Sequence, residues 1–380
     1  MKGDEVTREQ TPAKPRGLRA VGHGIDVARD WWEHAKIWQR YLVYIALVVG
    51  ALILPAPAIG TFMSPGSDWT TVLVYPIGTY ILLAVGLNVV VGQAGLLDLG
   101  FVAFFAIGGY SVAYYGTQYG WTYWATVAFG IILAAVSGVI LGAPTLRLRG
   151  DYLAIVTLGF GEIVRITANN TDEIGGARGI TGIPHPPPVF GMKFVLDPAP
   201  YYYLIVAAIV LVIIFSVRLQ KSRVGRAWAA IREDEDAAEL MGVPTFKFKL
   251  LAFAIGAMIG GLAGGIYAGK AVFIEPNTFP FILSATILAA VVLGGSGNLP
   301  GVILGAFLIG WLPERFREFA DFRILVFGGV LVLMMALRPE GLLPSRRRKA
   351  ELHEGTGGMG TMGAEVPGPD ADVSTTEAAK

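Results

Sequence analysis

The sequence contains no cysteine and only four histidines among its 380 residues. Disulfide bonds, thiolate metal sites and cysteine nucleophiles are therefore excluded. The histidines stand in separate polar stretches and form no group with metal-ligand spacing. The formal net charge is +1, which argues against nucleic acid as a partner. We expect neither a metal nor a cofactor bound to this chain.

Charged residues are also scarce. They make up 16% of the chain, whereas soluble domains contain about a quarter. Hydrophobic residues make up 54%, and the mean hydropathy is +0.57. This balance is typical of an integral membrane protein. The 50 glycines fit the same class, because small residues let helices approach closely in a bilayer.

Apolar runs of about the 20 residues that a spanning helix needs follow one another from residue 41. They cover 41–63, 70–92, 99–116, 122–143, 152–168, 201–217 and 248–268. Two further runs differ: 282–312 is interrupted by GGSGNLPG, and 324–338 is short. We expect an all-α polytopic membrane protein with about eight to ten transmembrane helices and a broken or re-entrant segment near 282–312.

Basic residues indicate the orientation. They gather in the segment 218–247 and again at 346–349, and both should face the cytoplasm by the positive-inside rule. If the N-terminus is cytoplasmic, six spans bring the chain back to the cytoplasm at the segment 218–247. The seventh span then takes it out of the cytoplasm. A cytoplasmic C-terminus then requires 282–312 to cross twice, or to enter and leave on one side.

The two ends of the chain differ from the apolar domain at 41–340. Residues 1–40 are polar but contain Trp31, Trp32 and Trp38, so they form either an interfacial helix or a disordered cytoplasmic segment. Residues 341–380 are poor in bulky side chains and are expected to be a disordered cytoplasmic tail.

A charged segment, KSRVGRAWAAIREDEDAAELMGVP, occupies 221–244. Trp228, Ile231, Ala238 and Met241 fall near one helical face, which predicts a helix lying along a surface. Gly242 and the proline two residues later form a stop signal. A solvated connector is the alternative from periodicity alone.

Four polar residues in apolar runs are candidates for a translocation path: Asn88, Gln93, Glu162 and Arg165. Glu162 and Arg165 are three residues apart and can pair on one helix. Facing lipid would cost each about 2.5–3.5 kcal/mol near the bilayer centre. A structural interhelical role and a polar path both remain open. Gln93 and Asp98 have a further alternative in a cytoplasmic turn, which is favoured for Asp98.

Glycines recur every four residues in several runs, and these rows predict close helix packing. They are Gly256, Gly260 and Gly264; Gly138 and Gly142; and Gly301 and Gly305. The stretch GGIYAGKA resembles a phosphate-binding loop but ends in Ala271, which has no hydroxyl for magnesium. We therefore expect no ATP hydrolysis by this chain alone.

The stretch GRAWAAIREDEDAAELMGVP resembles the cytoplasmic coupling loop of ABC importer permeases, in the form typical of the LivM branch of branched-chain amino acid permeases. Three other blocks resemble the same family in the same order, and together they cover about 75–342. They are GLNVVVGQAGLLDLGFVAFFAIGGY, LRLRGDYLAIVTLGFGEIVR, and the series VVLGGSGNLPGVILGAFL, LPERFRE and RPEGLL.

The resemblance implies a bacterial inner-membrane permease subunit for branched-chain or related hydrophobic amino acids, which is not itself an enzyme. Its implied partners are a second homologous permease subunit, two ATP-binding subunits and an extracytoplasmic amino-acid-binding protein. The coupling helix would dock on one ATP-binding subunit. Its residues by resemblance are Gly225, Arg226, Ile231, Arg232, Glu233, Ala237, Ala238, Glu239 and Gly242.

Two other transporters compete with this prediction. Within the same class, a related ABC permease for urea or short amides would share much of the framework. An ion-coupled secondary transporter would suit Glu162 and the broken 282–312 segment. It would not need a cytosolic docking helix. An intramembrane enzyme is disfavoured, since Glu162 alone is a poor candidate for acid–base chemistry.

Overall fold

The structure is a computed structural model that describes residues 68–146, 151–188 and 198–315. It also describes positions 50, 53–56, 60, 191, 194, 328, 329, 332 and 341–343. Two compact units divide the chain, and every element below belongs to the second, Pro57–Lys380. The predictions for 1–40 and for the tail beyond 343 lie outside the described residues, as do nearly all of the runs 41–63 and 324–338.

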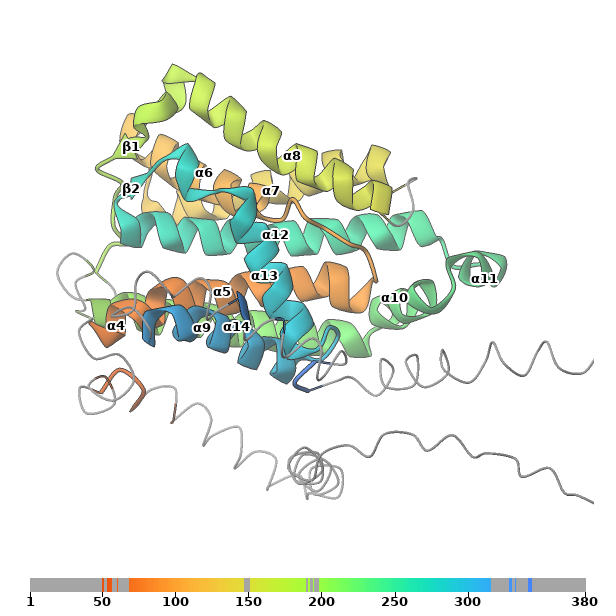
Figure 1. Cartoon of the computed structure of the whole chain (residues 1–380). Coiled ribbons are helices and arrows are strands. Elements are labelled where there is room, and N and C mark those ends of the chain that lie inside the picture. Colours follow the sequence, from red (N-terminus) through yellow and green to blue (C-terminus); the bar gives the residue numbers. More distant parts are fainter. Residues whose placement is uncertain are drawn as a thin grey trace, which may run out of the picture. The chain divides into compact units, whose positions relative to one another are not determined.

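Helices dominate the described residues, as Figure 1 shows. The first described span is a composite of α4 (Trp69–Val72), η1 (Leu73–Gly78), α5 (Thr79–Leu87) and η2 (Asn88–Gln93). The longer helices are α6 (Val102–Gln118), α7 (Tyr123–Thr145), α8 (Asp151–Asn170), α9 (Pro198–Lys221), α10 (Arg223–Glu233), α12 (Thr245–Ala271), α13 (Phe281–Gly294) and α14 (Leu299–Arg315). The short elements are η3 (Asp172–Ile174), η4 (Gly176–Arg178), β1 (Ile180–Thr181), α11 (Glu235–Leu240), β2 (Phe273–Ile274) and η5 (Pro276–Thr278).

The predicted all-α polytopic fold is confirmed. Five described segments are long and apolar enough to cross a membrane: Trp69–Gln93, Tyr123–Thr145, Pro198–Lys221, Thr245–Ala271 and Pro276–Gly294. Because parts of the first and last apolar runs are not described, the total number of crossings stays a prediction.

Helix α12 lies at the centre of the packing and contacts α5, α6 and α7. Glycines make this closeness possible, as the four-residue rows predicted. A Cβ on Gly264 would overlap the carbonyl oxygen of Phe105 on α6, and one on Gly256 would lie 2.6 Å from Val90. On the other side of α12, a Cβ on Gly138 of α7 would lie 2.8 Å from Ala257.

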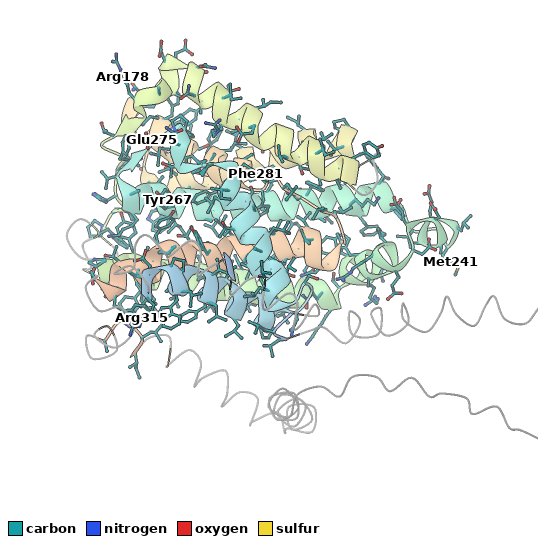
Figure 2. The ribbon with its side chains drawn as sticks, in the orientation of Figure 1. Arg178, Met241, Tyr267, Glu275, Phe281 and Arg315 are labelled. Carbon is teal, nitrogen blue, oxygen red and sulfur yellow. The ribbon has the colours of Figure 1, made fainter. Side chains whose placement is uncertain are left out.

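The broken segment predicted at 282–312 is a hairpin of α13 and α14. Ser284, near the start of α13, accepts a hydrogen bond from the Val102 backbone N–H at 3.0 Å. The turn between the helices reaches Asn88, whose Oδ1 accepts from the Gly297 N–H at 2.8 Å. Helix α14 then returns, so that Arg315 and Met241 lie at opposite ends in Figure 2. The predicted broken segment is therefore a hairpin, and its number of membrane crossings stays a prediction.

The end of the unit opposite Met241 carries irregular structure. Strands β1 and β2 pair antiparallel, with Ile180 opposite Ile274. Arg178 and Glu275 mark this end in Figure 2. The Gly- and Pro-rich loop after α8 thus packs on the connection between α12 and α13.

Candidate coupling and translocation site

The charged segment folds as two helices, α10 and α11, where one had been expected. Asp234 has extended φ/ψ angles of −155° and 113°, and its side chain accepts from the Ala237 N–H at 2.9 Å. It therefore caps α11 and ends α10. The predicted stop is confirmed by Gly242, whose φ is +84°. Met241 does not share the buried face, because α11 turns it outward and leaves it 85% exposed.

One face of α10 is anchored to the start of α12. Trp228 is completely buried, and its indole N–H donates to the Phe248 carbonyl at 2.7 Å. Lys249, which is only 3% exposed, forms an ion pair with Glu235 of α11. A buried cation without such a partner would be costly, so this pair fixes α11 relative to α12.

Arg232 links α10 to two breaks in the membrane helices. Its guanidinium donates to the carbonyl of Gly92, at the end of η2. The Arg232 side chain also lies close to two glycines. A Cβ added to Gly95 would lie 2.9 Å from Arg232 Cγ, and one added to Gly297 would lie 3.2 Å from Arg232 Nη1. The Arg232 side chain therefore lies against both the η2 terminus and the α13–α14 turn.

The opposite face of α10–α11 is open. Leu240, which is not among the predicted coupling residues, is 89% exposed. Among the predicted coupling residues, Arg226, Glu233, Ala237, Glu239 and Gly242 are exposed, Gly225 and Arg232 are half-buried, and Ile231 and Ala238 are buried. An amphipathic helix pair thus presents two large apolar side chains within an acidic rim.

Asn88 and Gln93 lie beside this linkage. Asn88 is completely buried; its Oδ1 accepts from Gly297, but its Nδ2 has no hydrogen-bond partner in the described structure. The amide group of Gln93 is buried without a described partner as well. Buried polar groups of this kind usually meet water or a ligand, since leaving them unpaired costs about 1–3 kcal/mol.

Asp98 lies in the irregular connection between η2 and α6, and the cytoplasmic turn favoured for it stays a prediction. It is completely buried, and its Oδ1 accepts from the Gly100 N–H at 2.8 Å. Thr157 of α8 accepts from the neighbouring Leu99 N–H at 3.0 Å. Residues 94–101 form a non-helical connection that contacts Thr157 of α8, so the hydrophobic run from 99 includes a non-helical entry into α6.

Glu162 and Arg165 form the predicted pair on α8. Arg165 Nη2 lies 2.8 Å from Glu162 Oε2, and Nε donates to the same oxygen at 2.9 Å. Both side chains are about 30% exposed. The pair satisfies itself on α8, whereas Asn88 and Gln93 lie in η2 next to the α13–α14 turn. The four predicted path residues therefore form two groups.

Residues 341–343 dock on the α13–α14 turn, although the disordered tail was expected to begin at 341. The Leu342 N–H donates to Leu293 at 2.7 Å, and the Leu343 N–H donates to Gly294 at 3.1 Å. Asn298 Nδ2 donates to the Leu343 carbonyl at 2.7 Å. Hydrogen bonds thus hold residues 341–343 in place, although the composition of 341–380 predicts disorder.

Substituting Gly341 should release this contact. Its φ is +88°, and an added Cβ would lie 2.8 Å from Gly295. We expect Gly341→Val to cost about 1–2 kcal/mol from the left-handed backbone alone. Faster amide hydrogen exchange at 293–298 would be the observable. Gly120→Val is the control, since Gly120 has a φ of +63° but open space around it. Equal exchange at 293–298 in both variants would contradict this prediction.

Comparison with known proteins places these features in a family. The family described as the permease component of branched-chain amino acid transport systems matches residues 70–337. The chain belongs to this permease family. The match includes α10–α11, the α13–α14 hairpin and all four predicted path residues. No solved structure matches the chain.

Relatives within the permease family agree with this assignment. The LivM permease protein of the high-affinity branched-chain amino acid transport system of Escherichia coli is 44% identical over 368 residues, covering 90% of this chain and 84% of its own length. A probable LivM permease of Methanocaldococcus jannaschii is 30% identical and covers 68% of this chain and 84% of its own length. The fructose import permease FrcC of Rhizobium meliloti is 25% identical, covering 68% of this chain and 76% of its own length.

Proposed function

We propose that this permease is one of two homologous membrane subunits of an ABC importer that carries branched-chain or related hydrophobic amino acids across the bacterial inner membrane. Two ATP-binding subunits would supply hydrolysis, and an extracytoplasmic binding protein would deliver substrate. Both termini would be cytoplasmic. The 44% identity to a LivM protein supports this cargo over urea, short amides or a sugar. The ion-coupled alternative is not favoured by the family match.

The observation that carries the proposal is the two-sided character of α10–α11. Trp228, Lys249 and Arg232 tie its inner face to the membrane helices. Its outer face exposes Leu240 and Met241, 89% and 85% respectively. Large apolar side chains this exposed indicate a protein contact. We assign that contact to an ATP-binding subunit.

Force applied to α10–α11 would reach the membrane helices through Arg232. Its two neighbours are the end of η2 at Gly92 and the α13–α14 turn at Gly297, and Asn88 bridges them. A coupling device must be contacted differently in two states, and two short turns joined by single hydrogen bonds can rearrange at low cost. ATP-driven movement of the docked subunit would shift both turns together.

The unpaired Nδ2 of Asn88 and the unpaired amide of Gln93 suggest the cytoplasmic part of the translocation path. They can hydrogen-bond water or the charged groups of a passing amino acid without a fixed charge that would trap it. Glu162 and Arg165 would contribute on α8, where their mutual pairing lowers the cost of lying in the membrane.

The proposed docking surface at Leu240 and Met241 is tested by replacing its apolar side chains with charged ones. We expect Leu240→Asp combined with Met241→Asp to abolish co-purification of the ATP-binding subunit, because charged residues would replace the apolar contact. Glu239→Lys should do the same by charge reversal. Lys247→Glu is the control, being exposed on the neighbouring turn. Membrane insertion should be unchanged in all variants. Normal co-purification and uptake with the double variant would refute the docking role.

The path assignment is tested at Asn88. Asn88→Ala leaves the half-buried Gly297 N–H without its acceptor, at a cost of about 1 kcal/mol. We expect uptake of radiolabelled leucine by cells to fall about tenfold. Asn170→Ala, at an exposed site on α8, should leave uptake unchanged. Equal uptake in the two variants would remove Asn88 from the path.

A further inference from the structure

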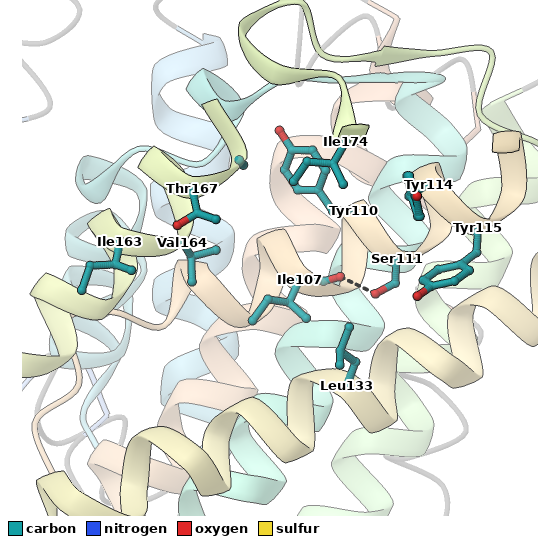
Figure 3. Close-up of a pocket in the computed structure, with 11 residues that line it drawn as sticks. Ile107, Tyr110, Ser111, Tyr114, Tyr115, Leu133, Ile163, Val164, Thr167 and Ile174 are labelled. Atoms are coloured by element: carbon teal, nitrogen blue, oxygen red, sulfur yellow. Dashed lines mark hydrogen bonds between the residues drawn. The ribbon is translucent and has the colours of Figure 1, made fainter. Parts of the chain in front are cut away.

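Helices α6, α7 and α8, with Ile174 of η3, line an open cavity of about 350 Å³ that the proposed path does not use (Figure 3). Its lining includes Ile107, Tyr110 and Ser111 of α6, Leu133 of α7, and Val164 and Thr167 of α8. No charged side chain lines it among the described residues. A site that binds an amino acid zwitterion tightly, as opposed to letting it pass, needs partners for its two charges, and this cavity offers no charged partner.

One of the residues that line this cavity has a buried polar group without a partner. Tyr110 is 9% exposed, and its hydroxyl is buried without a hydrogen-bond partner in the described structure. The neighbouring Ser111 hydroxyl donates to the Ile107 carbonyl at 2.7 Å. Tyrosine hydroxyls in apolar surroundings usually find an acceptor. The cavity therefore suits a mainly apolar molecule that carries a hydrogen-bond acceptor.

The cavity opens on an apolar surface. Leu133 is 40% exposed and Ile163 is 63% exposed, and both belong to its lining. The same faces of α7 and α8 expose Ile132 and Ile166. Since α7 is long and apolar enough to cross a membrane, this mouth faces either the bilayer or a partner's membrane helix.

Aromatic residues locate the cavity along the membrane normal. Tyr115 contacts both Tyr119 and Trp121 at the junction of α6 and α7. Tyr119 is 61% exposed, and Trp124 is 41% exposed. Exposed Tyr and Trp at helix ends mark the membrane–water interface. Tyr110 lies about one to two turns deeper, which is the level of lipid ester groups and upper acyl chains.

We propose that this cavity binds an acyl chain of a bilayer glycerolipid, in the leaflet remote from α10–α11, with the Tyr110 hydroxyl donating to the lipid ester carbonyl. The chain would fill the space between α8 and the α6–α7 pair. Helix α8 carries Glu162 and Arg165, so a bound lipid would also hold these residues in position. The proposal depends on membrane insertion and not on the cargo.

A photoreactive lipid tests this site directly. The full chain, assembled with its partner subunits, would be placed in nanodiscs of phosphatidylethanolamine and phosphatidylglycerol containing a trace of phosphatidylcholine with a diazirine near the ester end of one chain. We expect labelled peptides to concentrate at 107–115 and 163–168. Val164→Phe, which fills the cavity, should reduce this labelling at least about tenfold. Ile140→Phe, on the exposed face of α7, should not reduce it.

Further readouts keep the proposal falsifiable if Val164→Phe folds poorly. Tyr110→Phe should keep the cavity but reduce the phospholipid retained by the wild-type complex in native mass spectrometry. Labelling no stronger at the cavity than at 136–140 would overturn the proposal. So would displacement of the lipid by leucine, which would make the cavity part of the substrate path, or photo-crosslinking from position 133 to a partner subunit.

Discussion

Arg232→Ala is expected to lower uptake of branched-chain amino acids about 10- to 100-fold while the permease still inserts and still binds its ATP-binding subunit. The guanidinium donates to the Gly92 carbonyl, and a charged hydrogen bond contributes about 1.5–3 kcal/mol. Its loss would separate α10 from η2 and from the α13–α14 turn. Since Leu240 and Met241 are unchanged, docking should persist. ATP hydrolysis by the reconstituted transporter should therefore continue without transport.

Two substitutions separate this role from a general effect of charge. Arg223→Ala removes a cation from the exposed start of the same helix and should leave uptake near normal. Arg232→Lys keeps the charge but loses the planar fork of donors, so an intermediate rate is expected. Uptake and ATP hydrolysis would be measured together in proteoliposomes. Full coupling in Arg232→Ala would show that force reaches the membrane helices by another route.

Gly108→Leu should prevent the permease from folding. A Cβ at this position would overlap the Gly261 carbonyl oxygen and lie 2.6 Å from the Gly261 Cα. The backbone of α12 therefore leaves no room for a side chain at Gly108. Overpacking in a close-packed core costs about 1–3 kcal/mol even when side chains can move. Because two helix backbones would have to separate, we expect the larger end of this range or more. Detergent-solubilised protein should aggregate on size exclusion.

The control for this prediction is Gly159→Leu on α8. Nothing lies within 4 Å of a Cβ at that site, so the substitution should be tolerated and uptake should be kept. Gly108→Ala should be intermediate. A monodisperse, active Gly108→Leu variant would mean that α6 and α12 are not in contact as described.

Much of this fold could be predicted from composition and periodicity. Hydrophobic runs located the spans within a few residues, and the interruption at GGSGNLPG predicted the α13–α14 hairpin. Glycine rows predicted the contacts of α12. These features depend on local sequence and on the thickness of the bilayer, so they require no knowledge of tertiary contacts.

The errors in prediction have tertiary or capping causes. The burial of Asp98 has a tertiary cause, because Thr157 of α8 packs on the neighbouring Leu99. Asp234 ends α10 by capping α11, and the acidic first turn of DEDAAEL was the available signal. The docking of 341–343 depends on hydrogen bonds to residues about 45 positions away, which no local pattern reveals.

The central claim is that the exposed end of α11 docks on an ATP-binding subunit. The absence of cysteine allows a direct measurement, because each introduced cysteine is unique in this chain. Met241→Cys, co-expressed with an ATP-binding subunit carrying cysteines along its docking groove, should form a disulfide-linked heterodimer under mild oxidation. Arg178→Cys, at the opposite end in Figure 2, should form none. Cross-linking from position 178 and none from position 241 would contradict the account.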